Sequence, residues 1–246
     1  MSVVTMGGRY GAGGRVLGAA VAERLEADYV DRLILANAAR QAGATVEALH
    51  ERESRPSTRG ERLTSMLQRI LERSAITSSG GDPYFGPGAM ALLTLEFEDL
   101  PEPTITRGHE LEDEKYFEAI RSVITDLAAA GNVVIVGRGG SLILRDYPRV
   151  LRVGTVAHME DRITRTMELQ RIDHDEAEKV LVDRDAARAD YYKRYFGVDD
   201  ADDPNRYHLV INTSEVDVGY AETIVVGAAE ALDKGDLRPE VGLGAQ

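Results

Sequence analysis

The chain has 246 residues, of which 43% are hydrophobic and 29% charged, and its formal net charge is -13 at pH 7. This length suits one α/β domain with a single large core, whereas so negative a surface repels a nucleic-acid backbone and argues against polymer binding as the main task. The absence of cysteine excludes disulfides, a thiolate nucleophile and cysteine-ligated zinc.

The first part of the sequence predicts a strand, a glycine-rich loop, a helix and a second strand. Ser2–Met6 is a short β-prone run, and apolar residues then recur at spacings of three and four from Val16 to Leu25, as in an amphipathic helix. A second short strand is predicted at Asp28–Val30, followed by a helix that begins near Leu33. Strands that alternate with helices indicate a parallel sheet with right-handed crossovers.

Residues 45–112 interrupt this alternation. The segment combines charged helical stretches with the run Ser78–Gly88, which is rich in glycine, proline and serine. We interpret it as an inserted, mostly helical lobe within a single domain that spans residues 1–246.

Regular alternation resumes near residue 116. Val133–Val136 is apolar at every position, as expected for a central parallel strand covered on both faces. It leads into a Gly-Arg-Gly-Gly loop, at the sheet edge where open α/β folds bind ligands. Residues 233–246 are predicted to form a flexible tail. The other predicted elements are helices at Tyr116–Ala130, Met159–Gln170, His174–Tyr195 and Tyr220–Leu232 and strands at Val150–Val156 and His208–Thr213.

The loop after the first predicted strand has the spacing of a phosphate-binding loop, Gly8-x-x-x-x-Gly13. Glycines at this spacing allow backbone N–H groups to converge on phosphate oxygens at a helix N-terminus. Gly14 occupies the usual lysine position, and Arg15 occupies the position of the magnesium-binding hydroxyl. A tight strand-to-helix turn would also use glycines, but the guanidinium groups of Arg9 and Arg15 beside the loop favour an anion.

Four segments together resemble the cytidylate kinase-like family. They are Val4–Arg15 (VTMGGRYGAGGR), Val134–Gly139 (VIVGRG), the pattern Asp185-x-x-Arg188-x-x-Tyr191-Tyr192 and His208–Ser214 (HLVINTS). The similarity covers most of the chain except residues 50–110. It implies a parallel-sheet P-loop NTPase fold of the nucleoside monophosphate kinase type, with a helical lid at residues 160–205 and the 45–112 lobe on the acceptor side. The implied activity moves a phosphoryl group from ATP, with Mg²⁺, to a small phosphorylated or nucleotide acceptor.

The resemblance also implies roles for individual residues. Phosphoryl transfer needs positive charge around aligned oxygens, so arginines are the main catalytic candidates. Arg138 matches the position that holds the acceptor phosphate, and Gly139 stands where cytidylate kinases carry an aspartate. Arg184 and Arg188 would close over the phosphates while Asp185 orients an arginine or the acceptor, although a solvated helix face is the alternative. The implied catalytic set is Arg15, Arg138, Arg184, Asp185 and Arg188, and the implied nucleotide-binding set is Gly8, Arg9, Tyr10, Gly11, Ala12, Gly13, Gly14 and Arg15.

Three more charged residues are candidates with open roles. Asp31 follows the second strand and is predicted to bind Mg²⁺ through water or to accept a substrate proton, while it equally suits the N-cap of the next helix. Arg162 and Arg165 lie on one side of the helix that precedes the lid helix, where they reach either ATP phosphates or solvent.

Two other function classes stay open on the sequence alone. The chain could be a nucleotide-sensing module that lacks turnover, because Gly14 and Arg15 replace the lysine and the hydroxyl of the loop. Alternatively, the part of the lobe around Pro83 to Leu95 is the working part, as an interaction surface or as the contact of a homodimer. The N-terminal residues lack the basic and apolar regions of a signal peptide, and no stretch reaches the roughly 18 apolar residues of a membrane span, so we expect a cytoplasmic protein without membrane partners.

Overall fold

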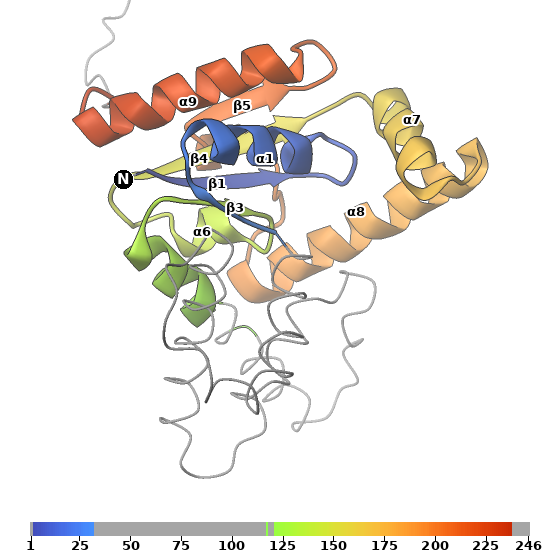
Figure 1. The fold of residues 1–246 in the computed structure, drawn as a ribbon. Coiled ribbons are helices and arrows are strands. Elements are labelled where there is room, and N and C mark those ends of the chain that lie inside the picture. Colours follow the sequence, from blue (N-terminus) through green and yellow to red (C-terminus); the bar gives the residue numbers. More distant parts are fainter. Residues whose placement is uncertain (1, 32–116, 118–120, 238–246) are drawn as a thin grey trace, which may run out of the picture.

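The computed structural model describes residues 2–31, 117 and 121–237 (Figure 1). Within these ranges, five parallel strands form one sheet in the order β2-β3-β1-β4-β5. This arrangement confirms the predicted α/β fold with a parallel sheet. The strands are β1 (Val3–Gly8), β2 (Asp28–Val30), β3 (Val133–Val136), β4 (Val150–Val156) and β5 (Leu209–Asn212).

Helices cover both faces of the sheet. The α1 and α9 helices pack on one face, and α6, α8 and the helix that includes residues 121–130 lie on the other (Figure 1). The α7 helix precedes α8 and packs against it beyond the sheet edge. The bounds are α1 (Gly14–Arg24), α6 (Gly140–Ile143), α7 (Met159–Gln170), α8 (His174–Phe196) and α9 (Val218–Lys234), with a 3-10 turn at Pro204–Arg206.

Alternation along β1 places its side chains in two hydrophobic clusters. Val3 joins the cluster on the α8 face, while Val4 and Met6 join the cluster formed with α1 and α9. Successive side chains of a strand point to opposite faces of the sheet, so a strand buried on both sides must be apolar throughout. This requirement explains why β3 consists of valine and isoleucine only, and why β1 begins with two valines and carries no charged residue.

Most predicted element bounds agree closely with the structure. The β2, β3 and β4 strands and α7 have the predicted limits, and α8 ends one residue later than predicted. The α9 helix begins at Val218 and ends at Lys234, so two residues of the predicted tail belong to it. The predicted 45–112 lobe, the predicted helix near Leu33 and residues 238–246 of the tail lie outside the described residues.

The carboxyl ends of the strands are the feature that positions the site. Because all five strands are parallel, the loops that follow β1, β3, β4 and β5 leave the same edge of the sheet. In the described part of the chain, no helix combines the length and the apolar character that crossing a membrane requires.

Candidate functional site

The glycine loop joins β1 to the N-terminus of α1. Gly11 and Gly13 have positive φ angles of 75° and 79°, in the left-handed region that favours glycine. Gly13 is the N-cap of α1, and the first turn of this helix carries no acidic residue. The first N–H groups of a helix have no partner within the helix, and the helix dipole makes this end positive. The predicted loop therefore has the backbone geometry of an anion site.

The glycine loop packs against the end of β4. Thr155 is buried, and its hydroxyl donates to the carbonyl of Gly7 at 3.2 Å. A Cβ atom on Gly8 would lie 2.5 Å from the Thr155 carbonyl oxygen, and one on Gly14 would lie 3.0 Å from the Thr155 hydroxyl. The absence of a lysine at Gly14 thus allows the loop to lie directly on β4.

Two arginines of α7 hold carbonyl groups of the loop. Arg162 Nε donates to the carbonyl of Tyr10 at 2.8 Å, and Arg165 Nη1 donates to the carbonyl of Gly11 at 3.0 Å. Both arginines were predicted to reach either ATP phosphates or solvent. Their observed contacts are to the loop backbone, and a contact with ATP phosphates stays a prediction. Two positive charges consequently lie beside the loop although Gly14 carries none.

Thr213, which follows β5, completes the attachment of the loop. Its hydroxyl donates to the carbonyl of Ala12 at 3.1 Å and accepts a hydrogen bond from Arg165 Nη1 at 2.8 Å. Arg165 Nη2 also donates to the Thr213 carbonyl at 2.7 Å. The side chains that fix the loop therefore come from α7 and from the ends of β4 and β5.

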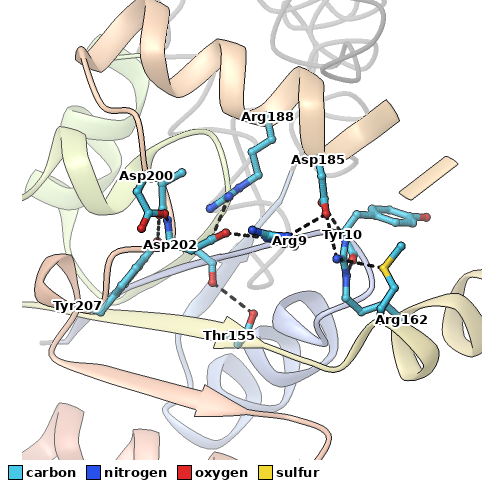
Figure 2. Close-up of polar contacts among 12 residues, drawn as sticks. Arg9, Tyr10, Thr155, Arg162, Asp185, Arg188, Asp200, Asp202 and Tyr207 are labelled. Atoms are coloured by element: carbon cyan, nitrogen blue, oxygen red, sulfur yellow. Dashed lines mark hydrogen bonds and ion pairs between the residues drawn. The ribbon is translucent and has the colours of Figure 1, made fainter. Parts of the chain in front are cut away.

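Asp185 of α8 contacts arginines from two other elements (Figure 2). Its carboxylate forms a bidentate pair with Arg162, at 2.8 and 2.9 Å, and Arg162 is only 3% exposed. Arg9 Nη1 of the glycine loop lies 3.4 Å from the same carboxylate. The sequence predicted that Asp185 orients an arginine or the acceptor, and the observed partners are arginines.

Asp202, in the segment after α8, is a site residue that the sequence analysis missed. Its Oδ2 accepts from Arg9 Nε at 2.7 Å, and its Oδ1 lies 3.0 Å from Arg188 Nη1. The hydrogen bond to Asp202 raises the pKa of Arg9 above its ordinary value. No local pattern marks Asp202, because it lies in an acidic loop of the kind that is usually only solvated.

Arg184 and Arg188 are one turn apart on α8 and contact different parts of the molecule. The Arg184 guanidinium lies over the ring of Tyr10, 4.2 Å from its centroid. The Arg188 guanidinium is buried and lies 4.7 Å from the centroid of the Tyr192 ring. The α8 helix, part of the predicted lid, thus touches the glycine loop through Arg184, Asp185 and Tyr10, and it reaches Asp202 through Arg188.

Arg138 follows β3, which lies on the side of β1 opposite to β4. It is buried, and its φ angle of 53° lies in the left-handed region. Its carbonyl accepts a hydrogen bond from the Tyr191 hydroxyl at 3.5 Å. A Cβ on Gly139 would clash with the ring of Phe196, so this residue of α8 fills the space that a side chain at position 139 would need.

Arg15 and Asp31 form an ion pair at the end of β2. Arg15 Nη2 lies 2.9 Å from Asp31 Oδ2, which also accepts from the Tyr29 hydroxyl at 3.1 Å. Burial and the Asp31 charge raise the pKa of Tyr29 to about 12. Among the described residues, no group of three or more His, Cys, Asp or Glu side chains forms a metal site. The Mg²⁺ role of Asp31 stays a prediction, and its observed contacts are to Arg15 and Tyr29.

A family model and a sequence relative agree with each other. A model of the cytidylate kinase-like family matches residues 3–215. A cytidylate kinase from Methanocaldococcus jannaschii is 34% identical over 111 residues, which are 44% of this chain and 62% of that protein. The matched part thus spans less than two thirds of the length of this relative.

A solved structure shares the fold at low sequence identity. An uncharacterized protein from Eubacterium ventriosum aligns over 94% of this chain and 98% of its own, with a TM-score of 0.56 and 18% identity. A shikimate kinase from Bacteroides thetaiotaomicron aligns over 93% of this chain and 98% of its own, with a TM-score of 0.43 and 14% identity, which is too distant to inform function.

Proposed function

Because the chain belongs to the cytidylate kinase-like family, we propose that it transfers a phosphoryl group from ATP to a nucleoside monophosphate or a similar small acceptor. The observation that carries this proposal is the glycine loop at the head of α1, with Arg9 in the loop held beside Arg188 of the lid helix by one carboxylate. A loop of amides beside two guanidinium groups is suited to a chain of phosphates.

The loop and α7 would bind the nucleotide phosphates. The N–H groups of the first turn of α1 supply hydrogen-bond donors, and the loop carbonyls are held by Arg162 and Arg165. The charge of Arg162 is paired with Asp185, so Arg165 is the arginine of α7 whose positive charge would compensate for the lysine that is absent at position 14. ATP would supply the transferred group, and Mg²⁺ would neutralise part of its charge.

The acceptor would bind between the β3 loop and the lid helix. Arg138, which follows β3, and Arg188 of α8 are buried cations. Arginine suits bidentate contacts with a phosphate. In phosphoryl transfer the protein contributes alignment and charge rather than covalent chemistry. Fixed arginines on both sides of the moving group meet this requirement.

The alternative function is a nucleotide-sensing module that binds without turnover. The observation that favours it is the pairing of Arg15 with Asp31, which turns this guanidinium toward the end of β2. If Arg15 does not reach the transferring phosphate, Arg9 and the α7 arginines must supply all the charge on the donor side.

The test is a turnover assay with ATP and Mg²⁺ against a panel of nucleoside monophosphates. Kinase activity predicts ADP formation above the no-acceptor background with at least one acceptor. A melting temperature raised by ATP without turnover would favour the sensing module. If ATP gave neither turnover nor a raised melting temperature, both the kinase function and the sensing function would be contradicted.

A further inference from the structure

Asp202 contacts two site arginines that belong to different elements (Figure 2). One carboxylate oxygen accepts from Arg9 Nε at 2.7 Å, and the other lies 3.0 Å from Arg188 Nη1. Arg9 comes from the glycine loop and Arg188 from α8. The two oxygens of a single carboxylate therefore link the loop that would bind nucleotide to the lid helix.

The contacts with Asp202 leave other arginine donors available. Arg9 uses Nε for Asp202 and Nη1 for a longer contact of 3.4 Å with Asp185, and its side chain is 52% exposed. Arg188 is engaged through Nη1 and is 7% exposed, and within the described residues its buried Nη2 makes no hydrogen bond. A buried charged donor without an acceptor costs free energy, and an oxygen of a bound anion would satisfy it.

The backbone around Asp202 is itself fixed. The N–H of Asp202 donates to Asp200 Oδ1 at 2.9 Å, and Arg206 Nε donates to the carbonyl of Asp200 at 3.2 Å. The Tyr207 hydroxyl donates to the carbonyl of the buried residue Ala201 at 3.1 Å. These bonds anchor the carboxylate before any ligand arrives, which is the condition for it to orient other side chains.

Charge explains why a carboxylate between the two arginines favours anion binding. Two guanidinium groups brought to one place repel each other, and one carboxylate offsets one of the two charges while it fixes both side chains. The pair then keeps one net positive charge. A ligand meets guanidinium groups that are already oriented, so it loses less free energy in ordering them.

We propose that Asp202 is a positioning residue that holds Arg9 and Arg188 side by side to receive the phosphates of the nucleotide. The inference rests on the proposed function and adds to it a residue that acts through the two arginines without touching the substrate.

The test is calorimetric titration of inorganic tripolyphosphate into the full chain, since this probe carries phosphates but no base. We expect Asp202→Asn to weaken binding about tenfold or more, because it removes the charge that orients both arginines. Asp202→Glu should restore part of the affinity. The matched control is Asp199→Asn, which removes one charge from the same loop at a residue that is 84% exposed and pairs with Lys193; it should bind as the wild type does.

Other results of these measurements would overturn the positioning role of Asp202. Equal or tighter binding by Asp202→Asn, with binding by the wild type intact, would overturn the positioning role and leave the proposed function standing. No binding of tripolyphosphate by the wild type would overturn the inference, while the turnover assay with ATP decides separately on the proposed function. A lower thermal midpoint without the ligand, and no rescue by Glu, would identify a purely structural residue. If Asp202→Asn does not fold, Arg9→Lys tests the same contact, because it keeps the charge but removes Nε; unchanged affinity there would also overturn the inference.

Discussion

Arg162 is the residue on which the attachment of the glycine loop depends most. It is buried, forms a bidentate pair with Asp185 and donates to the carbonyl of Tyr10. These three bonds use Nε and both terminal nitrogens of one guanidinium. The single nitrogen of a lysine cannot reproduce three bonds that are made from three separate nitrogens in a planar fork.

Replacing Arg162 with lysine should therefore lower the free energy of unfolding by about 1.5 to 3 kcal/mol, although the charge is kept. Chemical denaturation measures this change. The control is Arg24→Lys, because Arg24 is exposed and pairs with Glu222 at 3.0 Å; surface pairs of this kind contribute little. Equal effects of the two substitutions would contradict the role given to Arg162.

Gly8 is a position where no side chain fits. Its φ angle is 154°, and an added Cβ would meet the carbonyl of Thr155 at 2.5 Å. We expect Gly8→Ala to cost about 2 kcal/mol or more of stability. Gly227 on α9 is the matched control, since no described atom lies within 4 Å of an added Cβ there. Gly227→Ala should stabilise by about 0.5 to 1 kcal/mol, and thermal unfolding compares the two; a neutral Gly8→Ala would refute the packing argument.

The sequence analysis selected the residues of the candidate site that belong to a local pattern and missed those that do not. Gly8, Gly13, Asp185 and Arg188 were predicted from spacing and from a family resemblance, and the structure brings Asp185 next to the loop. Asp202 carries no such signal, because its partners are distant in sequence and a carboxylate in an acidic loop is usually solvated. The contacts of Arg162 and Arg165 with the loop backbone were not predicted either, since helical spacing gives a common face but no partner.

Two residues that support the loop could have been found from their positions at strand ends. Thr155 lies near the end of β4, and Thr213 directly follows β5. Ligand-binding loops of a parallel sheet leave this edge, so a polar residue there is a candidate by topology. Neither residue stands out by type or spacing, which explains why the sequence analysis did not select them.

The imidazole of His208, directly before β5, takes part in the pairing of β5 with β4. The N–H of Arg152 donates to His208 Nδ1 at 3.0 Å, and the N–H of His208 donates to the carbonyl of Arg152 at 2.8 Å. The imidazole accepts a backbone hydrogen bond only while Nδ1 is unprotonated. Burial, with a smaller effect of Arg152, lowers the pKa of His208 below its ordinary value of 6.5.

This geometry predicts a pH-dependent contribution to stability. Because the folded-state pKa is the lower one, the unfolded chain takes up the proton at higher pH. The stabilisation is therefore complete above about pH 6.5 and is lost as the pH falls through the folded pKa. We expect the stability difference between wild type and His208→Asn, which cannot titrate, to shrink as the pH is lowered. Denaturation curves at several pH values measure it, and a constant difference would contradict the prediction.

Regular elements were predicted well because periodicity reports burial. The β3 strand is apolar at each position, and α7 alternates apolar and charged residues with a helical period, so both have the predicted limits. The short α6 helix was missed, since four residues within a glycine-rich loop carry no period. The 3-10 turn at Pro204–Arg206 is too short for a periodic signal as well.

The whole chain is strongly acidic, yet its candidate site gathers arginines. The formal net charge is -13, while Arg9, Arg162, Arg165 and Arg188 converge on the glycine loop and the lid helix, with the carboxylates of Asp185 and Asp202 between them. The parallel sheet produces this convergence, because β1, β4 and β5 deliver their loops to one edge. A local positive site within a negative surface favours a small anionic ligand over a polyanion.

The most direct test of the central claim, that the loop and the lid arginines form one phosphoryl-transfer site, is transfer of label from γ-labelled ATP to a nucleoside monophosphate. It compares the wild type with Arg9→Ala and with Arg24→Ala, an exposed arginine of α1 that pairs with Glu222. We predict a labelled nucleoside diphosphate from the wild type and from Arg24→Ala, and about tenfold or more slower transfer by Arg9→Ala with little change in melting temperature. No labelled product from any folded variant, or equal rates for the two substitutions, would contradict the claim.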